Sequence, residues 1–178
     1  MATTATILLM PAAAVLPDGA TNEAAPAIVR NQSSFAAGAN APKVHFLSLD
    51  FDPTTDEYCF FGFRMPSDYA SAPVLKVQWM ANAVANSVIW VCKVGAVSPA
   101  DADTPIEHVQ GADNSATTAV NTTEANRLTE TSITLTNADS LAPGDLVLLT
   151  VFRDATAAGD TCTVDAKLVA ASLEYTTT

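Results

Sequence analysis

The sequence predicts an all-β protein, a sandwich or a barrel of eight strands, and three observations lead to this fold class. Short segments rich in Val, Leu, Ile, Phe, Trp or Tyr recur along the chain. Pro, Asp, Asn, Gly or Ser residues flank most of these segments, and no helical pattern lies between them. Eight strands at such spacing are typical of all-β sandwiches and barrels. The segments are residues 43–51, 57–65, 74–81, 87–97, 105–110, 131–136, 145–153 and 162–175.

The first two segments alternate in the way that half-buried strands do. In 43–51, one face runs from His45 to Phe51 in steps of two residues, which predicts a single buried face. In 57–65, aromatic residues occupy both faces. We therefore expect that strand to be central in its sheet, with Pro66 ending it.

The middle segments place both tryptophans on apolar faces. Segments 74–81 and 87–97 alternate apolar and polar residues, with one tryptophan in each. A polar stretch separates 87–97 from the short segment 105–110. Residues 111–126 are rich in Gly, Asn, Ser, Thr and Ala, a composition that predicts a surface loop.

The last three segments differ in their patterns. Segment 131–136 is short, and 145–153 is apolar nearly throughout, which predicts a fully buried central strand. In 162–175 the apolar phase changes at 168–169, which indicates a β-bulge. The side chains that we expect to be mostly buried are Phe61, Phe63, Leu75, Val77, Trp79, Trp90, Leu148 and Phe152.

Residues 1–42 form a leader that differs from the sandwich expected over residues 43–178. The leader has four prolines, many alanines and an Asp-Gly turn signal, and residues 5–10 and 27–30 could add edge strands. Disordered tails normally lack apolar side chains. We therefore favour an extended N-terminal arm that contacts a partner over a loose tail. The candidate contact residues of the arm are Ile7, Leu8, Leu9, Met10, Val15, Leu16, Ile28 and Val29.

Composition narrows the classes of partner. Hydrophobic residues make up 49% of the chain and charged residues only 15%, so we expect some apolar surface to be buried against other chains. The net charge of −11, with no cluster of Lys or Arg, argues against nucleic acid and anionic membranes as partners. No stretch reaches the roughly 18 uninterrupted apolar residues of a membrane span.

No pattern predicts catalysis, a cofactor or a metal site. His45 and His108 are the two histidines, and no Gly-x-Ser-x-Gly nucleophile elbow is present. Acidic residues cluster around the turn at 50–57, where aspartate capping of the turn is the simplest interpretation and calcium binding stays open.

The three cysteines predict buried free thiols. Their number is odd, their spacing fits no metal site, and each lies among apolar neighbours in an expected strand. Free thiols are typical of assembly in a reducing cytosol. The residues are Cys59, Cys92 and Cys162.

The strand residues of the body resemble a known family. The sequences Leu-Asp-Phe-Asp at 49–52, Phe-Arg-Met-Pro at 63–66, Val-Gln-Trp at 77–79 and Val-Phe-Arg-Asp at 151–154 are similar to those of jelly-roll capsid decoration, or cement, proteins of tailed bacteriophages. The resemblance covers about 45–175, excludes the leader and transfers no catalytic residue. It implies a jelly roll in which strands one, three, six and eight share one sheet and the others share the second.

The resemblance also implies a function. Such proteins are structural virion proteins that sit on the outer surface of the bacteriophage head as homotrimers and stabilise it. The expected partners are a second copy of the chain and the major capsid protein, and assembly would occur in the cytoplasm of the host bacterium. The alternative is a phage tail-fibre or receptor-binding β-domain that contacts a host glycan, and an enzyme is not expected.

Overall fold

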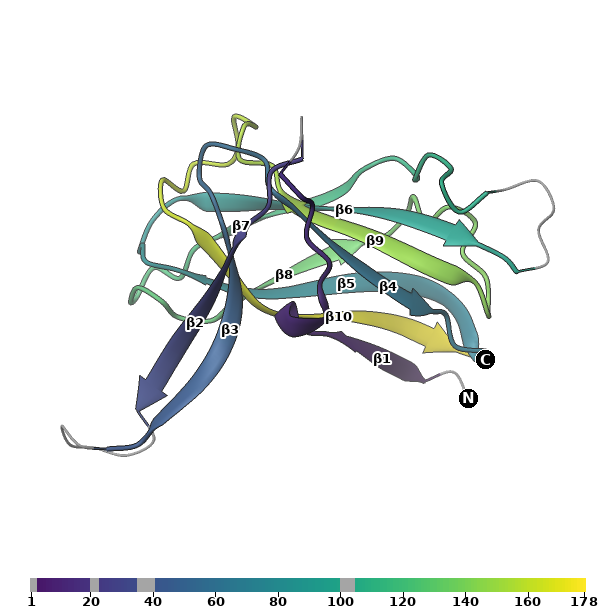
Figure 1. The fold of residues 1–178 in the computed structure, drawn as a ribbon, viewed down its shortest axis with the longest axis horizontal. Helices are drawn as coiled ribbons and strands as arrows, with labels where there is room; N and C mark the ends of the chain where they lie inside the picture. Colours follow the sequence, from purple (N-terminus) through teal and green to yellow (C-terminus); the bar gives the residue numbers. More distant parts are fainter. Residues whose placement is uncertain (1–2, 20–22, 35–40, 100–104) are drawn as a thin grey trace.

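The computed structural model describes residues 3–19, 23–34, 41–99 and 105–178, which form two antiparallel sheets packed face to face (Figure 1). One sheet has the order β2-β3-β10-β5-β8, with β1 also paired to β10, and the other has the order β4-β9-β6-β7. The strands are β1 (Thr4–Leu9), β2 (Ala27–Ser34), β3 (Lys43–Phe51), β4 (Tyr58–Arg64), β5 (Tyr69–Ala81), β6 (Ser87–Val97), β7 (Asn114–Ala119), β8 (Thr129–Thr134), β9 (Leu146–Arg153) and β10 (Ala166–Thr177).

The eight strands from β3 to β10 have jelly-roll topology, so the predicted fold class is confirmed. The first, third, sixth and eighth of them lie in one sheet in the order β3-β10-β5-β8. The second, fourth, fifth and seventh form the other sheet. Every connection between these strands except that from β6 to β7 therefore crosses from one layer of the sandwich to the other.

The fifth strand was predicted in the wrong place. Residues 105–110 form a turn, in which the His108 N–H donates to the Pro105 carbonyl at 3.1 Å. The strand is instead β7, within the 111–126 segment that was expected to be a surface loop. Its small Ser, Thr and Ala side chains give a weak apolar signal, and its pairing with β6 decides its conformation.

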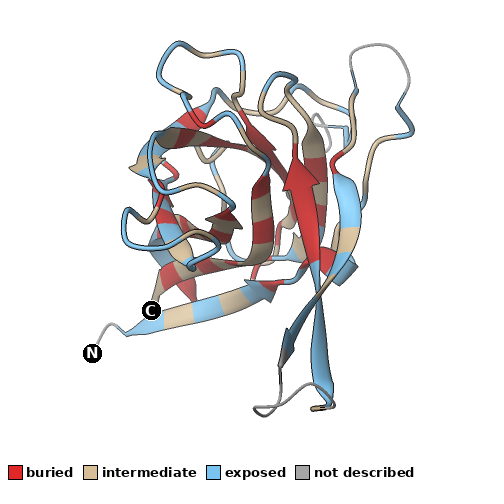
Figure 2. Cartoon of the chain, turned by 90° about the vertical axis from the view of Figure 1, so that its left-hand side faces the viewer, coloured by how far each residue is buried: buried red, intermediate tan, exposed pale blue. Residues whose placement is uncertain are grey.

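The core lies between the two sheets and is built around aromatic rings. Phe51 meets Trp90 edge to face with ring centroids 5.0 Å apart, and Trp79 lies 6.3 Å from Trp90. Figure 2 shows the buried residues concentrated in the strands of the sandwich, while the loops are mostly exposed or intermediate. All eight residues expected in the core are buried except Phe63 and Leu148, which are half-buried.

Leu148 is half-buried because β9 alternates over residues 146–149, and the strand is buried on both faces only from Leu149 to Arg153. Val147, Leu149 and Val151 point into the core, whereas Leu148 faces outward. The bulge predicted at 168–169 is confirmed, because the pairing of β10 with β5 shifts after Leu168 and leaves Val169 without a register partner.

The leader adds two strands to the sandwich of its own chain. β1 lies antiparallel on β10 over Ala171–Thr176, and β3 occupies the same side of β10 only over Ala166–Leu168. Beyond that point, β3 pairs only with β2, and the two strands run away from the sandwich as a ribbon (Figure 1). We define the ribbon as β2 together with residues 43–48 of β3. Among the described residues, no helix has the length and apolar character to cross a membrane.

Candidate interaction face

The leader wraps around the edge of the sandwich before it reaches the ribbon. After β1, a short 3₁₀ turn at Pro11–Ala13 packs near β3 and β10. Val15 and Phe60 then exchange backbone hydrogen bonds of 2.9 Å, and the Tyr58 N–H donates to the Ala24 carbonyl. β4 is an edge strand of its sheet and not the central strand that the sequence predicted. The contacts with the leader cover its free edge, which would otherwise present unpaired backbone groups.

One side of the leader contacts the core and the other is exposed. In β1, Ile7 and Leu9 turn inward and pack on the core, while Leu8 points outward with 73% of its surface exposed. Val15 is 64% exposed, although its backbone is hydrogen-bonded to β4. Backbone pairing thus fixes a strand whose outer side chains have no packing role in this chain.

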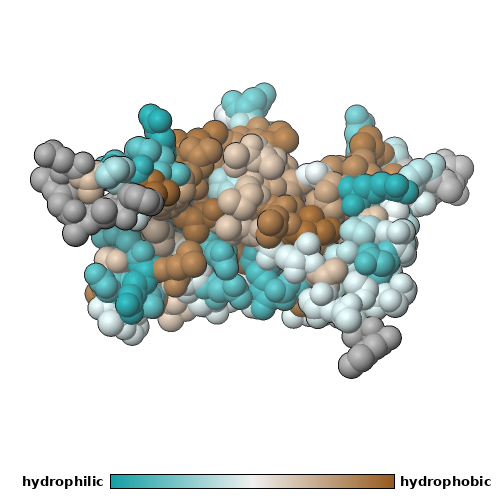
Figure 3. All heavy atoms as spheres, turned by 90° about the horizontal axis from the view of Figure 1, so that it is seen from below, coloured by the Kyte–Doolittle hydropathy of each residue, from teal (hydrophilic) through white to brown (hydrophobic). Residues whose placement is uncertain are grey.

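The exposed side chains define an apolar face made of Leu8, Met10, Val15, Ile28 and Leu47. Figure 3 shows apolar residues gathered over the side of the molecule on which β1 and the ribbon lie. Single exposed apolar side chains are ordinary, but a group of them on one side of a molecule suggests an interaction surface. We therefore take this apolar face as the candidate functional site.

The structure separates the eight arm residues predicted from the sequence. Leu8, Met10, Val15 and Ile28 are exposed and belong to the apolar face. Leu9 is buried in the core, and the half-buried Ile7 and Leu16 pack against it, so these three hold the leader to the sandwich. Val29 is half-buried within the ribbon, where it pairs with Ser48.

Sequence reasoning missed the contribution of β3. Residues 43–51 were expected to bury one face, but burial begins only at Ser48, and Val44, Phe46 and Leu47 are exposed. His45, expected to pack, is exposed as well. The sequence did contain a signal, because apolar residues occupy both alternating faces of this segment. A strand that buries only one face would carry apolar residues on that face alone.

The base of the ribbon is anchored by a chain of polar contacts. Asn31 Nδ2 donates to Ser48 Oγ at 2.7 Å, and Ser48 in turn donates to the buried carboxylate of Asp50. Lys167 Nζ of β10 binds the same carboxylate at 2.6 Å. These contacts link β2, β3 and β10, so the ribbon leaves the sandwich from a fixed point.

A polar hollow of about 640 Å³ lies between the ribbon and the sandwich. Its lining combines amide side chains with the ring of Phe46, a methionine and a lysine. The lining residues are Asn31, Gln32, Ser33, Phe46, Met80, Asn82, Asn126 and Lys167. Amide groups offer both donors and acceptors to a neutral polar ligand.

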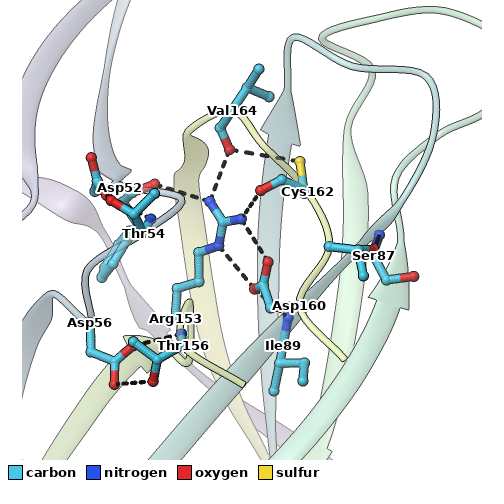
Figure 4. A network of polar contacts seen from close by, with 12 residues as sticks. Asp52, Thr54, Asp56, Ser87, Ile89, Arg153, Thr156, Asp160, Cys162 and Val164 are labelled. Carbon is cyan, nitrogen blue, oxygen red and sulfur yellow. Dashed lines mark hydrogen bonds and ion pairs between the residues drawn. The ribbon is translucent and has the colours of Figure 1, made fainter. Parts of the chain in front are cut away.

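The most extensive buried polar network has a structural role (Figure 4). Arg153 of β9 is fully buried and binds the Asp160 carboxylate through two hydrogen bonds, of 2.7 and 2.9 Å. Its remaining donors reach the carbonyl oxygens of Phe51, Cys162 and Val164. The guanidinium thus uses its five donors to fold the β9–β10 connection around itself and offers none to a substrate.

The second histidine does not complete a catalytic triad. Ser98, His108, Asp139 and Ser140 line one hollow, but both ring nitrogens of His108 are engaged. His108 Nε2 lies 2.6 Å from Asp139 Oδ2, and Nδ1 lies 3.0 Å from the Pro105 carbonyl. A general base needs a free nitrogen facing its nucleophile. The pair instead ties the β6–β7 connection to the turn before β9.

The acidic turn after β3 is shaped by local capping. Asp52 Oδ1 accepts hydrogen bonds from the backbone N–H groups of Thr54 and Thr55 and from the Thr54 hydroxyl. The Thr54 hydroxyl bond is the main cause that lowers the pKa of Asp52, ahead of an opposing effect of burial. Within the described ranges, no group of three or more His, Cys, Asp and Glu side chains could hold a metal ion.

The fold and the apolar face together define a jelly-roll β-sandwich with exposed apolar side chains on one side. No family model matches the sequence, and no curated protein matches it. Among solved structures, the chain is similar over 99% of its length to 32% of a chain in the structure of infectious bursal disease virus, Gx strain, with a TM-score of 0.38 and 11% identity.

Two carbohydrate-binding modules also share this general architecture. A module of the β-sandwich superfamily with promiscuous specificity matches 99% of this chain and 54% of its own, with a TM-score of 0.35 and 7% identity. A CBM28 module specific for non-crystalline cellulose matches 93% of this chain and 85% of its own, with a TM-score of 0.41 and 10% identity. The chain thus spans about a third and about half of the first two chains. Likeness at this level is compatible with a structural or a binding role and decides neither.

Proposed function

We propose that this chain is a structural virion protein, a capsid decoration or cement protein that binds the outer surface of a bacteriophage head as a homotrimer and stabilises it without catalysis. The observation that carries the proposal is the apolar face, in which backbone-paired strands present exposed side chains with no packing role in their own chain. Its partners are a second copy of the chain and the major capsid protein.

Three further features support this function. The jelly roll is a common architecture of viral shell proteins. The net charge of −11 suits an outer surface away from packaged DNA. The polar networks around Arg153 and His108 are internally satisfied, which favours a scaffold over an enzyme.

A second candidate function rests on the polar hollow. Its amides and the Phe46 ring are side chains that suit a sugar, so a tail-fibre or receptor-binding domain that contacts a host glycan is the alternative. The polar hollow is open to solvent beside the ribbon. Glycan recognition in this hollow would leave the apolar face without a function, whereas the decoration function uses that face. We therefore place the decoration function first.

The test is to locate the protein on the virus particle. A cryo-EM map of the phage that encodes the chain is expected to show jelly-roll density on the outside of the head, and density on tail fibres would favour the alternative. Purified protein added to heads that lack it should co-sediment with them and raise the temperature at which they release DNA.

A matched pair of variants sharpens the binding assay. Leu8→Ser with Val15→Ser removes two side chains of the apolar face outside the ribbon and should abolish co-sedimentation. Val109→Ser changes an apolar side chain that is 91% exposed outside that face, and binding should be retained. Equal binding by both variants would contradict the proposed role of the apolar face.

A further inference from the structure

The ribbon differs in charge from the rest of the chain. Residues 24–49 contain two of the eight lysines and arginines, Arg30 and Lys43, together with His45, and none of the nineteen acidic residues. All three side chains are exposed, and the register places Arg30 beside Leu47 and Gln32 beside His45. The ribbon therefore presents basic and apolar groups together in an otherwise acidic protein.

An acidic counterpart lies elsewhere on the same molecule. The turn between β3 and β4 carries Asp52 and Asp56, and the β9–β10 connection carries Asp154 and Asp165. The two segments are adjacent, because the Thr156 N–H donates to Asp56 Oδ1 at 3.2 Å. Figure 1 shows both segments on the side of the molecule opposite the outer end of β2. A single chain therefore cannot bring the ribbon to its own acidic end.

We propose that the ribbon of one copy docks on the acidic end of a second copy, so that the chain assembles head to tail. Charge complementarity selects this partner, because the acidic end and the basic ribbon belong to the same sequence. The basic side chains of the ribbon meet the carboxylates of the neighbour, and Ile28 and Leu47 lose exposed apolar area at the same contact. The inference rests on the proposed function only for the number of copies.

The two docking surfaces differ, so the same contact can be repeated from one copy to the next. A contact between unlike surfaces is heterologous, and it generates a closed ring when the rotation between copies closes. A ring of three is the trimer of the proposed function, whereas in a twofold dimer each ribbon would have to reach the acidic end of the same partner reciprocally. The anchored base at Asp50 fixes the angle at which the ribbon leaves the sandwich, as a closed ring requires.

The test measures association of the isolated full chain by sedimentation velocity over a range of protein concentrations and at low and high salt. The wild type should form trimers. Arg30→Glu should raise the dissociation constant by about tenfold or more, as should Ile28→Ser with Leu47→Ser. Asp154→Asn with Asp165→Asn should weaken association too, and high salt should narrow the difference between Arg30→Glu and the wild type.

Controls separate docking from folding and from charge in general. Arg127→Glu reverses an exposed charge on the β7–β8 connection and should leave association unchanged. Thermal unfolding of each variant should match the wild type. A wild type that stays monomeric, or ribbon or carboxylate variants that associate like the wild type, would overturn the inference.

Head binding is measured separately, so the two proposals fail separately. A monomeric chain that still co-sediments with heads would overturn head-to-tail docking and leave the decoration function intact. A trimer that requires the ribbon but does not bind heads would support docking and contradict the decoration function.

Discussion

Two buried tryptophans share the core but differ in how their indole N–H groups are satisfied. Trp79 Nε1 donates to Thr131 Oγ1 at 2.9 Å, whereas Trp90 Nε1 has no hydrogen-bond partner among the described residues. A buried donor without a partner costs roughly 1–3 kcal/mol, so its removal recovers part of that cost.

Trp90→Phe should therefore destabilise the protein less than Trp79→Phe, by about 1–2 kcal/mol in the free energy of unfolding. Both rings are fully buried, so the loss of volume is matched. Trp90→Ala should cost about 3–5 kcal/mol. Urea denaturation measures all three, and an equal cost for the two phenylalanine variants would contradict the role of the N–H groups.

The Arg153–Asp160 pair predicts a large effect for a single substitution. Both side chains are almost fully buried, so Asp160→Ala leaves an uncompensated guanidinium and should cost about 3–5 kcal/mol. Glu130→Ala breaks the exposed pair with Lys76 and should cost less than about 1 kcal/mol. Chemical denaturation of both variants compares them, and similar costs would show that the buried network is not needed for stability.

At the scale of elements, β1 provides a matched pair of neighbouring leucines. Leu9 is 4% exposed and Leu8 is 73% exposed, so Leu9 fixes the strand on the core and Leu8 points outward. Leu9→Ala should destabilise the fold by about 2–4 kcal/mol, and Leu8→Ala by less than about 0.5 kcal/mol. The opposite order in thermal or urea unfolding would show that β1 does not pair with β10 in this register.

The connection between β6 and β7 predicts a pH dependence through Asp139. Partial burial acts to raise the pKa of this carboxyl, but the Ala96 N–H and His108 outweigh it and hold the pKa below 3.8. A lowered folded pKa contributes stability above the unfolded value, and this contribution is lost as the pH falls through the folded value. The contacts of Asp139 with His108 and the Ala96 N–H should thus be intact at neutral pH and be lost in acid.

Asp139→Asn should lower stability at neutral pH and make the loss of stability below about pH 4 shallower than in the wild type. Melting temperatures measured across this range test both effects. Asp113→Asn serves as the control, since Asp113 is an exposed carboxylate that pairs with Lys93 on the surface. If the melting temperatures of Asp139→Asn and the wild type fell equally steeply in acid, the stabilising role of the Asp139 contacts would be contradicted.

Strands with large apolar side chains could be predicted from the sequence, and those without could not. The alternation around Trp79 and Trp90 gave β5 and β6 correctly, and the change of phase after Leu168 gave the bulge. β7 was missed because its Thr and Ala residues are held by pairing with β6, which is a tertiary effect. The departure of β3 from the sheet was missed because local pattern does not show where a neighbouring strand ends.

At the scale of the whole molecule, the three cysteines report on global unfolding. They lie in β4, β6 and the segment before β10, and all are buried free thiols, as the sequence predicted. Burial raises the pKa of Cys59 and Cys92 far above the usual value, so neither forms a reactive thiolate at neutral pH.

A thiol reagent should label no cysteine in the native protein and all three after denaturation. The labelling rate in native buffer should follow the rate or equilibrium of global opening, because the cysteines lie in two core strands and in the connection between the sheets. Fast labelling of one cysteine alone would reveal local opening and contradict this expectation.

The candidate site was predictable only in outline, since the sequence named exposed Leu8 and buried Leu9 alike.

The two ends of the described chain meet, because the Thr177 N–H donates to the Thr3 carbonyl at 2.8 Å and the two threonine hydroxyls lie 2.9 Å apart. A linker of a few residues could join these positions, and the backbone could be opened at an exposed turn such as the one after Ala81 without breaking a strand. Circular permutants of this jelly roll should therefore fold. A protein fused to either end would project from the same place, beside β1.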